Sequence, residues 1–439
     1  MNTLTNFFDS LMQKYLPDAF IFALLLTIIV FGAAVAVTPM SALEIVGFWG
    51  QGLDDLFKFA MEMTLILVSG FTLARSPFFV FLLDKLSANA NSPLKAVLLA
   101  TTVSIIACWF NWGFGLILAG LFAVELGRRV KDVNFALLVA ASYSGFLVWH
   151  GGISGSVPLK LTSPSSEVQR ILGMSKIGIE KTVFADFNLV LVFVTALTLL
   201  ILNYIFARSV KTKMEFVMPK AEQNIESKDL SDTPALRLEQ SKILNYIVVA
   251  IGFIYLGQQF SNGAGLNLNN LILLFIFLGM SFHMTPKNYL FQFSESVKDS
   301  AGIILQFPLY AGIMAIMRDS GLANMLSEFF VSISTKESFL MFTYWSAGIV
   351  NFFVPSGGGQ WALQAPFILP AAIKLGIDPA KASMAIAWGD AWTNMVQPFW
   401  ALPLLSVAKI PLRAIMGYCV MIFFVVGIVT SLSFWIISL

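Results

Sequence analysis

Charged residues are scarce in this sequence, and their scarcity indicates which broad class of protein, soluble or membrane, it belongs to. Only 12% of the 439 residues are Asp, Glu, Lys or Arg, whereas a soluble domain carries about 25%. Apolar runs of about 17–25 residues, long enough to cross a bilayer as helices, recur along the whole chain. These features exclude a soluble globular domain and predict an all-α polytopic membrane protein in a lipid bilayer.

A disulfide or metal-binding pattern, a strong net charge and the features of a signal peptide are also missing from this sequence. Cys108 and Cys419 lie in apolar segments and form no disulfide or metal-binding pattern. The net charge is +2, and the charges form short clusters between apolar runs, so no nucleic-acid partner is expected. The start, MNTLTNFFDSLMQKYLPDAF, lacks the basic region and cleavage site of a signal peptide. We therefore expect the first span, at about residues 17–37, to remain in the protein.

Motifs of intramembrane enzymes are nearly absent. The sequence has no H-E-x-x-H and no paired intramembrane aspartates. Gly152-Ile153-Ser154-Gly155 fits the G-x-S-G pattern of rhomboid-type serine proteases, with His283 as a distant base. So short a pattern arises readily by chance in a glycine-rich membrane protein. An enzyme is therefore kept only as a remote alternative.

One long hydrophilic stretch divides the chain. Residues 208–242 hold seven Lys or Arg and six Asp or Glu, which is typical of a linker. The sequence thus predicts a first membrane repeat at 1–207, a linker at 208–242 and a second membrane repeat at 243–439. Basic residues near the ends of spans favour a cytoplasmic linker.

Glycine, proline and polar residues interrupt the apolar runs in both halves. In the first half the interruptions are Asn111–Gly115 and His150–Pro158, and in the second they fall between Asn351 and Pro403. Broken backbone at membrane depth is tolerated only where protein or a water-filled cavity covers it. Paired interruptions at corresponding positions point to a transporter site between two repeats. We therefore predict re-entrant hairpins and broken helices in two repeats, with the inverted arrangement favoured.

Weak identities accompany this shared layout. A shift of 240 residues places Asn111 on Asn351, and a shift of 245 places Pro158 on Pro403. Apolar sequence matches itself easily, so the layout carries more weight than these identities.

The segment PSGGGQW is the predicted anion site. A half-helix beginning at Gln360 would point its positive end into a cavity, which suits a carboxylate. The alternative is a tight turn with glycines for packing. The predicted substrate-binding residues of both halves are Asn111, Ser154, Gly155, Ser156, Asn351, Ser356, Gly357, Gly358, Gly359 and Gln360.

Asp390 is the acid within the second-half interruptions. A charge at membrane depth must be paired, protonated or bound to an ion. It could carry a coupling proton, hold a sodium ion with Thr393 and Asn394, or cap a helix that begins after it. No other cofactor is expected. His150, at the end of a span, is interpreted as structural or interfacial.

Several long motifs carry a family resemblance. The segments PSGGGQWALQAPFILPAA and GDAWTNMVQPFWALPLL, with CWFNWGFGLILAG and GGISGSVPL in the first half, resemble the bacterial short-chain fatty acid transporter family. That family comprises permeases associated with acetoacetate and butyrate uptake. A more distant likeness joins GDAWTNMVQP to D-S-x-T-N-x-x-x-P of p-aminobenzoyl-glutamate transporters, in the wider ion transporter superfamily.

The resemblance implies a secondary carrier of small monocarboxylates in a bacterial inner membrane, driven by sodium or protons. It also implies a homodimer with inverted repeats. The matching site positions are Asn111, Ser154 to Ser156, Ser356 to Gln360, Asp390, Thr393 and Asn394. One departure is Ala391, where the distant relatives have Ser after Asp, so a hydroxyl ligand is missing.

A carrier of other organic anions, such as dicarboxylates, is the alternative within transport. No arginine or lysine falls within the interrupted motifs. A dianion would therefore lack a compensating charge, which favours a monocarboxylate.

Overall fold

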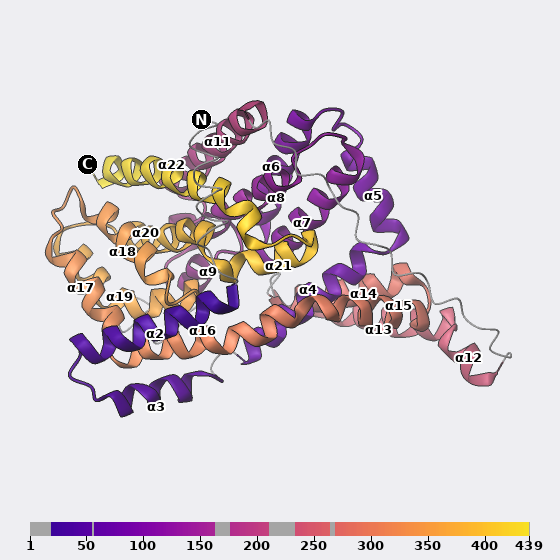
Figure 1. Cartoon of the computed structure of the whole chain (residues 1–439), viewed down its shortest axis with the longest axis horizontal. Helices are drawn as coiled ribbons and strands as arrows, with labels where there is room; N and C mark the ends of the chain where they lie inside the picture. Colours follow the sequence, from indigo (N-terminus) through magenta and orange to yellow (C-terminus); the bar gives the residue numbers. More distant parts are fainter. Residues whose placement is uncertain (1–18, 55–56, 163–175, 210–232, 264–267, 439) are drawn as a thin grey trace.

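The structure is a computed structural model that describes residues 19–54, 57–162, 176–209, 233–263 and 268–438. Every regular element within these residues is helical, with no strand (Figure 1). The predicted all-α class is therefore confirmed. Most of the predicted linker, residues 210–232, lies outside the described residues, as does the beginning of the chain up to residue 18.

The first half contains the following elements: α2 (Ala19–Val37), α3 (Ala42–Gly52), α4 (Phe57–Ala74), α5 (Pro77–Ser87), α6 (Pro93–Phe110), α7 (Trp112–Arg129), α8 (Phe135–Ser144), η1 (Gly145–Gly151), α9 (Ser156–Thr162), η2 (Ile179–Lys181) and α11 (Asp186–Ser209). The second half contains α12 (Pro234–Glu239), α13 (Lys242–Ser261), α14 (Leu268–His283), α15 (Pro286–Val297), η3 (Lys298–Ser300), α16 (Ala301–Asp319), α17 (Leu322–Ser332), α18 (Phe339–Asn351), α19 (Gly357–Lys374), α20 (Pro379–Thr393), η4 (Asn394–Val396), α21 (Pro398–Ala408) and α22 (Leu412–Ser438).

Length and composition fit many of these helices to a bilayer. Six stretches of the described residues are long and apolar enough to cross a membrane, or seven if the bent pair α4 and α5 counts as one. Their outer faces are apolar: on α13, Ile243, Ile251 and Ile254 are each more than 60% exposed. Such faces are costly in water and favourable against lipid. The chain is a multi-pass membrane protein.

The order of helices and breaks repeats between the halves. In each half two consecutive helices, α4–α5 or α16–α17, are followed by two more, α6–α7 or α18–α19, and then by a helix that breaks, α8–η1–α9 or α20–η4–α21. The starts of α7 and α19, Trp112 and Gly357, lie 245 positions apart. At this shift Asn111 corresponds to Ser356, the residue before α19, instead of Asn351. The inverted relation of the two repeats stays a prediction.

Capping residues explain where helices of the site begin. Asn111 ends α6 and accepts a hydrogen bond from Phe114 N at 3.0 Å, which starts α7. Asp378 accepts from Ala380 N at 2.8 Å, and Pro379 follows as the first residue of α20. A cap between two apolar runs thus converts one long run into two helices with a polar break.

One predicted boundary is wrong. The half-helix expected at Gln360 begins three residues earlier, at Gly357.

Figure 1 shows α2, α3 and α16 along the lower side of the molecule, and the broken helices within the bundle above them. Within that bundle α18 and α20 pack backbone to backbone. A Cβ on Gly389 would stand 2.3 Å from Tyr344 O, so only glycine allows this approach. The close packing of α18 on α20 brings Asn351 beside Asp390.

Candidate functional site

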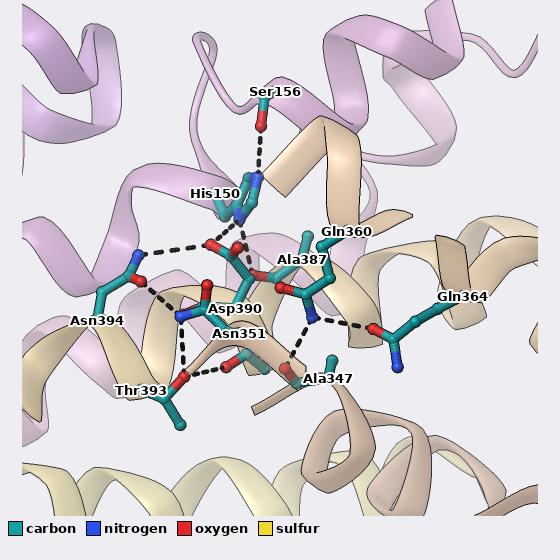
Figure 2. Close-up of polar contacts among 11 residues, drawn as sticks. His150, Ser156, Ala347, Asn351, Gln360, Gln364, Ala387, Asp390, Thr393 and Asn394 are labelled. Atoms are coloured by element: carbon teal, nitrogen blue, oxygen red, sulfur yellow. Dashed lines mark hydrogen bonds and ion pairs between the residues drawn. The ribbon is translucent and has the colours of Figure 1, made fainter. Parts of the chain in front are cut away.

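The two halves meet where their broken helices, α8–η1–α9 and α20–η4–α21, face each other. His150 lies in η1 of the first half and Asp390 near the end of α20 in the second, and both side chains are 0% exposed. His150 Nδ1 lies 3.1 Å from Asp390 Oδ1 and 2.8 Å from Ala387 O (Figure 2). Both of these oxygens accept, so Nδ1 must carry the hydrogen. His150 Nε2 lies 2.9 Å from Ser156 Oγ.

Contacts around η1 fix the imidazole in place. The ring stacks on Trp149 with 3.7 Å between centroids. Asn188 of α11 donates to Gly151 O at 2.9 Å and accepts from Trp388 Nε1 at 2.9 Å, which ties η1 to α20. The bond from Asn188 gives the Gly151 carbonyl, at the break, a hydrogen-bond donor.

The glycine-rich segment of the second half packs against the same histidine. A Cβ on Gly357 would stand 2.2 Å from His150 Cε1 and 2.5 Å from Ser156 Oγ. The first turn of α19 therefore lies directly on the His150–Ser156 pair. The segments HGGISGS and PSGGGQW, which the sequence predicts as interruptions of the first and second half, are in contact.

Asn351 organises a cluster of polar groups beside Asp390. Its Nδ2 donates to Asp390 O at 2.9 Å, Thr393 Oγ1 at 2.9 Å and Asn394 Oδ1 at 2.6 Å. Asn394 Nδ2 in turn lies 3.4 Å from Asp390 Oδ1. The predicted coupling residues Asp390, Thr393 and Asn394 are thus joined to one predicted substrate residue, Asn351. Asp390 lies inside α20, so the helix-cap alternative is wrong.

Gln360 points its amide nitrogen away from this cluster. Nε2 donates to Ala347 O at 2.7 Å and to Gln364 Oε1 at 2.9 Å. A carbonyl can only accept, so the contact with Ala347 O fixes which amide atom is nitrogen. Gln397 is oriented in the same way, by Nε2 donating to Asn351 O at 2.8 Å.

In the part of the chain that the structure describes, four buried oxygens of this polar network and of Gln360 beside it have no hydrogen-bond donor: Asp390 Oδ2, Asn351 Oδ1, Gln397 Oε1 and Gln360 Oε1. In Figure 2 the oxygens of Asn351 and Gln360 both turn toward the Asp390 side chain. Burying an acceptor without a donor is costly, so such groups call for an ion or water. Carboxylate and amide oxygens are ligands that hard cations prefer. The residues present therefore fit a small cation better than an anion at this point.

The remaining first-half residues hold the breaks together. Asn111 caps α7. Trp112, the residue after Asn111, donates from its backbone N to Ser154 Oγ at 2.8 Å. A Cβ on Gly155 would stand 2.6 Å from His150 O, so Gly155 lets the chain turn closely after the histidine. Among Ser154, Gly155 and Ser156, it is the Ser156 side chain that bonds to His150.

A cation that the sequence patterns missed lies at the first turn of α19. Lys160 Nζ donates to Gly358 O at 3.2 Å and stands 5.2 Å from the centroid of the Trp361 ring. Ser356, the residue before α19, makes no side-chain cap, and Gly358 and Gly359 are partly exposed beside it. One signal could have found Lys160: it is the sole charged residue in the apolar stretch Phe135–Thr162.

The protease pairing suggested by G-x-S-G is not formed. Ser154 bonds to Trp112 N, whereas His283 Nε2 lies 2.8 Å from Thr72 O in the contact of α14 with α4. The serine that does contact a histidine is Ser156, and with Asp390 it completes a chain of three residues ordered as in serine hydrolases. The comparisons with known proteins point instead to transport.

The structure is similar to the YdaH transporter of Alcanivorax borkumensis, with a TM-score of 0.42 and 14% identity over 96% of this chain and 98% of the other. It is also similar to MtrF of Neisseria gonorrhoeae, with a TM-score of 0.37 and 14% identity over 98% and 97%. Likeness at these scores supports no conclusion about this chain.

Closer relatives exist in sequence. A protein of Escherichia coli strain K12, named provisionally as a short-chain fatty acid transporter, is 40% identical over 430 residues, which cover 95% of each chain. A protein of Haemophilus influenzae with the same provisional name is 38% identical over 95% of this chain and 96% of its own. The family model described as short chain fatty acid transporter matches residues 1–437. The resemblance seen in the motifs is confirmed, and the chain belongs to the short-chain fatty acid transporter family.

Proposed function

We propose that this protein takes up short-chain fatty acids together with sodium by alternating access, across the inner membrane of a bacterium and as a homodimer. The observation that carries the proposal is the contact between His150 and Asp390, which joins the breaks of both halves at one buried point. A site shared by two repeats is where a transporter can open to either side by moving one repeat against the other.

The anion would bind at the first turn of α19. This helix has 18 residues, and its first N–H groups receive no side-chain cap from Ser356. Its positive end and the ammonium of Lys160 both attract a carboxylate. The Trp361 ring under that ammonium is fully buried, so it holds the lysine in place and is not itself a surface for the substrate.

Sodium would bind among the four buried oxygens that lack donors, at Asp390, Asn351, Gln360 and Gln397. Gln360 accordingly belongs with the cation in this proposal, although the sequence pattern grouped it with the anion. A proton on Asp390 would satisfy Oδ2 alone and leave three amide oxygens without a donor. This difference favours sodium over a proton as the coupling ion.

Uptake of radiolabelled butyrate into proteoliposomes tests the proposal. We expect a sodium gradient at equal pH to drive accumulation, and a proton gradient without sodium to drive none. Asp390→Asn should abolish accumulation but keep exchange of internal for external butyrate. Accumulation driven by protons alone would overturn sodium coupling, and no butyrate uptake under either gradient would overturn the substrate.

Lys160 also favours a second candidate, a carrier of dicarboxylates. The argument against a dianion was the lack of a cation in the interrupted motifs, but the Lys160 ammonium reaches Gly358 from outside them. Competition of unlabelled succinate with labelled butyrate separates the two. Inhibition by butyrate at tenfold or more lower concentration than by succinate supports the monocarboxylate carrier, and the reverse order supports the alternative.

A further inference from the structure

His150 touches both ends of the site through the two nitrogens of one ring. Nδ1 bonds to the acid Asp390 at 3.1 Å, and Nε2 bonds to Ser156 at 2.9 Å, on the side where α19 begins. The ring is fully buried, stacked on Trp149 and packed against Gly357. Because the ring is held this firmly, a change in the hydrogen bond at one nitrogen alters the acceptor strength of the other nitrogen through the electron distribution of the ring, without movement of the ring.

The directions of these hydrogen bonds follow from the atoms. Nδ1 donates, because Asp390 Oδ1 and Ala387 O can only accept. In the neutral ring Nε2 is then the acceptor, and the Ser156 hydroxyl donates to it. Donation from Nδ1 to a carboxylate strengthens the other nitrogen as a hydrogen-bond acceptor. Asp390 therefore holds the Ser156 hydrogen in place through the histidine.

We infer that His150 is a relay through which a cation on Asp390 releases the Ser156 hydroxyl to the carboxylate of the substrate. The inference rests on the proposed function. A cation draws negative charge away from the Asp390 carboxylate and weakens its hold on the Nδ1 hydrogen. Nε2 becomes a poorer acceptor in consequence. The Ser156 hydroxyl then gains more by donating to a carboxylate than to His150.

Ser156 is placed to make that exchange. Its oxygen lies 2.5 Å from the point where a Cβ on Gly357 would stand, against the first residue of α19. Its side chain is partly exposed, unlike those of His150 and Asp390. A short rotation of the hydroxyl is all that the exchange requires. His150 and Ser156 would thus make sodium and carboxylate bind cooperatively, and linkage requires the effect to be reciprocal.

Two variants cut the relay at one bond each. His150→Asn keeps an amide that can donate to Asp390 and Ala387 but has no atom in the place of Nε2. Ser156→Ala removes the hydroxyl and leaves the histidine intact. His283→Asn is the matched control, because it removes the other buried histidine, which bonds to Thr72 O away from the relay.

The measurement is the KM for butyrate uptake into proteoliposomes at low and at saturating sodium, with each variant checked for folding by size-exclusion profile. For the unaltered protein we expect sodium to lower the KM by at least about fivefold. In His150→Asn and in Ser156→Ala, the ratio of the KM at low sodium to the KM at saturating sodium should fall to within about twofold of one. The double variant should lose no more than either single variant, because both break the same chain. His283→Asn should keep the full ratio.

Sodium binding without butyrate supplies the second readout. Stabilisation of the purified protein by sodium should reach its half-maximum within about twofold of the unaltered value in Ser156→Ala. A full KM ratio in Ser156→Ala, or additive losses in the double variant, would overturn the relay. Butyrate uptake that ignores sodium in the unaltered protein would overturn the proposed coupling first, and the relay with it.

Discussion

At the scale of single residues, Gly357 has little freedom to change. A Cβ at this position would stand 2.2 Å from His150 Cε1 and 2.4 Å from Nε2, and the ring is held on all sides. We expect Gly357→Ala to lower the stability of the purified protein by about 1–3 kcal/mol, the usual cost of overpacking. It should also abolish sodium-driven butyrate uptake, because the added Cβ would push the His150 ring out of its contacts with Asp390 and Ser156.

The adjacent glycine gives the matched comparison. A Cβ on Gly358 would meet only the Ser156 Cβ, at 3.9 Å, which is ordinary contact. Gly358→Ala should therefore leave the thermal unfolding temperature unchanged or raise it slightly, since alanine suits a helix better than glycine does. Equal destabilisation by the two alanines would show that His150 is not packed on Gly357 as described.

Residue-level prediction from the sequence was uneven for a physical reason. Asp390 stood out because a lone acid in an apolar run is costly wherever it lies. His150 was interpreted as structural because its partners, Ala387 and Asp390, come from the other half of the chain. No local spacing rule relates residues so far apart. Lys160 was overlooked because it lies two residues beyond the motif that ends at Pro158.

At the scale of elements, α9 is the short helix that brings a charge to the site. It contains Ser156 at its first turn and Lys160 one turn later, so both face the start of α19. We expect Lys160→Gln to raise the KM for butyrate about tenfold, because a hydrogen bond to a charged group contributes about 1.5–3 kcal/mol. Lys160→Arg should restore part of the loss, since it keeps the charge.

Lys374→Gln is the control for net charge, because it removes one lysine from the exposed far end of α19. Its KM should stay within about twofold of the unaltered value. If Lys160→Gln and Lys374→Gln gave the same KM, the cation at Gly358 would have no part in binding.

Helix positions followed from the sequence more closely than the breaks did. Apolar length placed the first span at about residues 17–37, close to α2 at Ala19–Val37, because that signal lies within the segment itself. The break between α6 and α7 consists of one residue, Asn111, which caps α7. The break before α19 is longer and spans residues 352–356. Which residues face one another across these breaks depends on packing between helices, and sequence patterns do not encode that directly.

At the scale of the whole molecule, the contact between the halves can be locked. The Ser156 Cβ and the position of a Cβ on Gly358 are 3.9 Å apart, within the range of a disulfide. We expect the double variant Ser156→Cys, Gly358→Cys to crosslink the two halves on oxidation. If the halves move against each other during transport, the crosslinked protein cannot accumulate butyrate, and reduction should restore whatever uptake the reduced double variant shows.

Native thiols do not complicate this measurement, because Cys108 and Cys419 are both fully buried. The two single-cysteine variants serve as controls and should not respond to the oxidant. Uptake that persists through complete crosslinking would mean that transport needs no separation of Ser156 from Gly358.

The contact of His150 with Asp390 also bears on how the protein is made. The ribosome completes the first half about two hundred residues before Asp390 exists, so the histidine enters the bilayer without its acid. Until α20 is inserted, Nδ1 lacks both Ala387 O and Asp390 Oδ1, and the polar break at η1 lacks the indole of Trp388. Assembly of the second half is the step that satisfies them. A chain truncated in the linker would carry that break unprotected, which gives membrane quality control a physical mark by which to recognise an unfinished transporter.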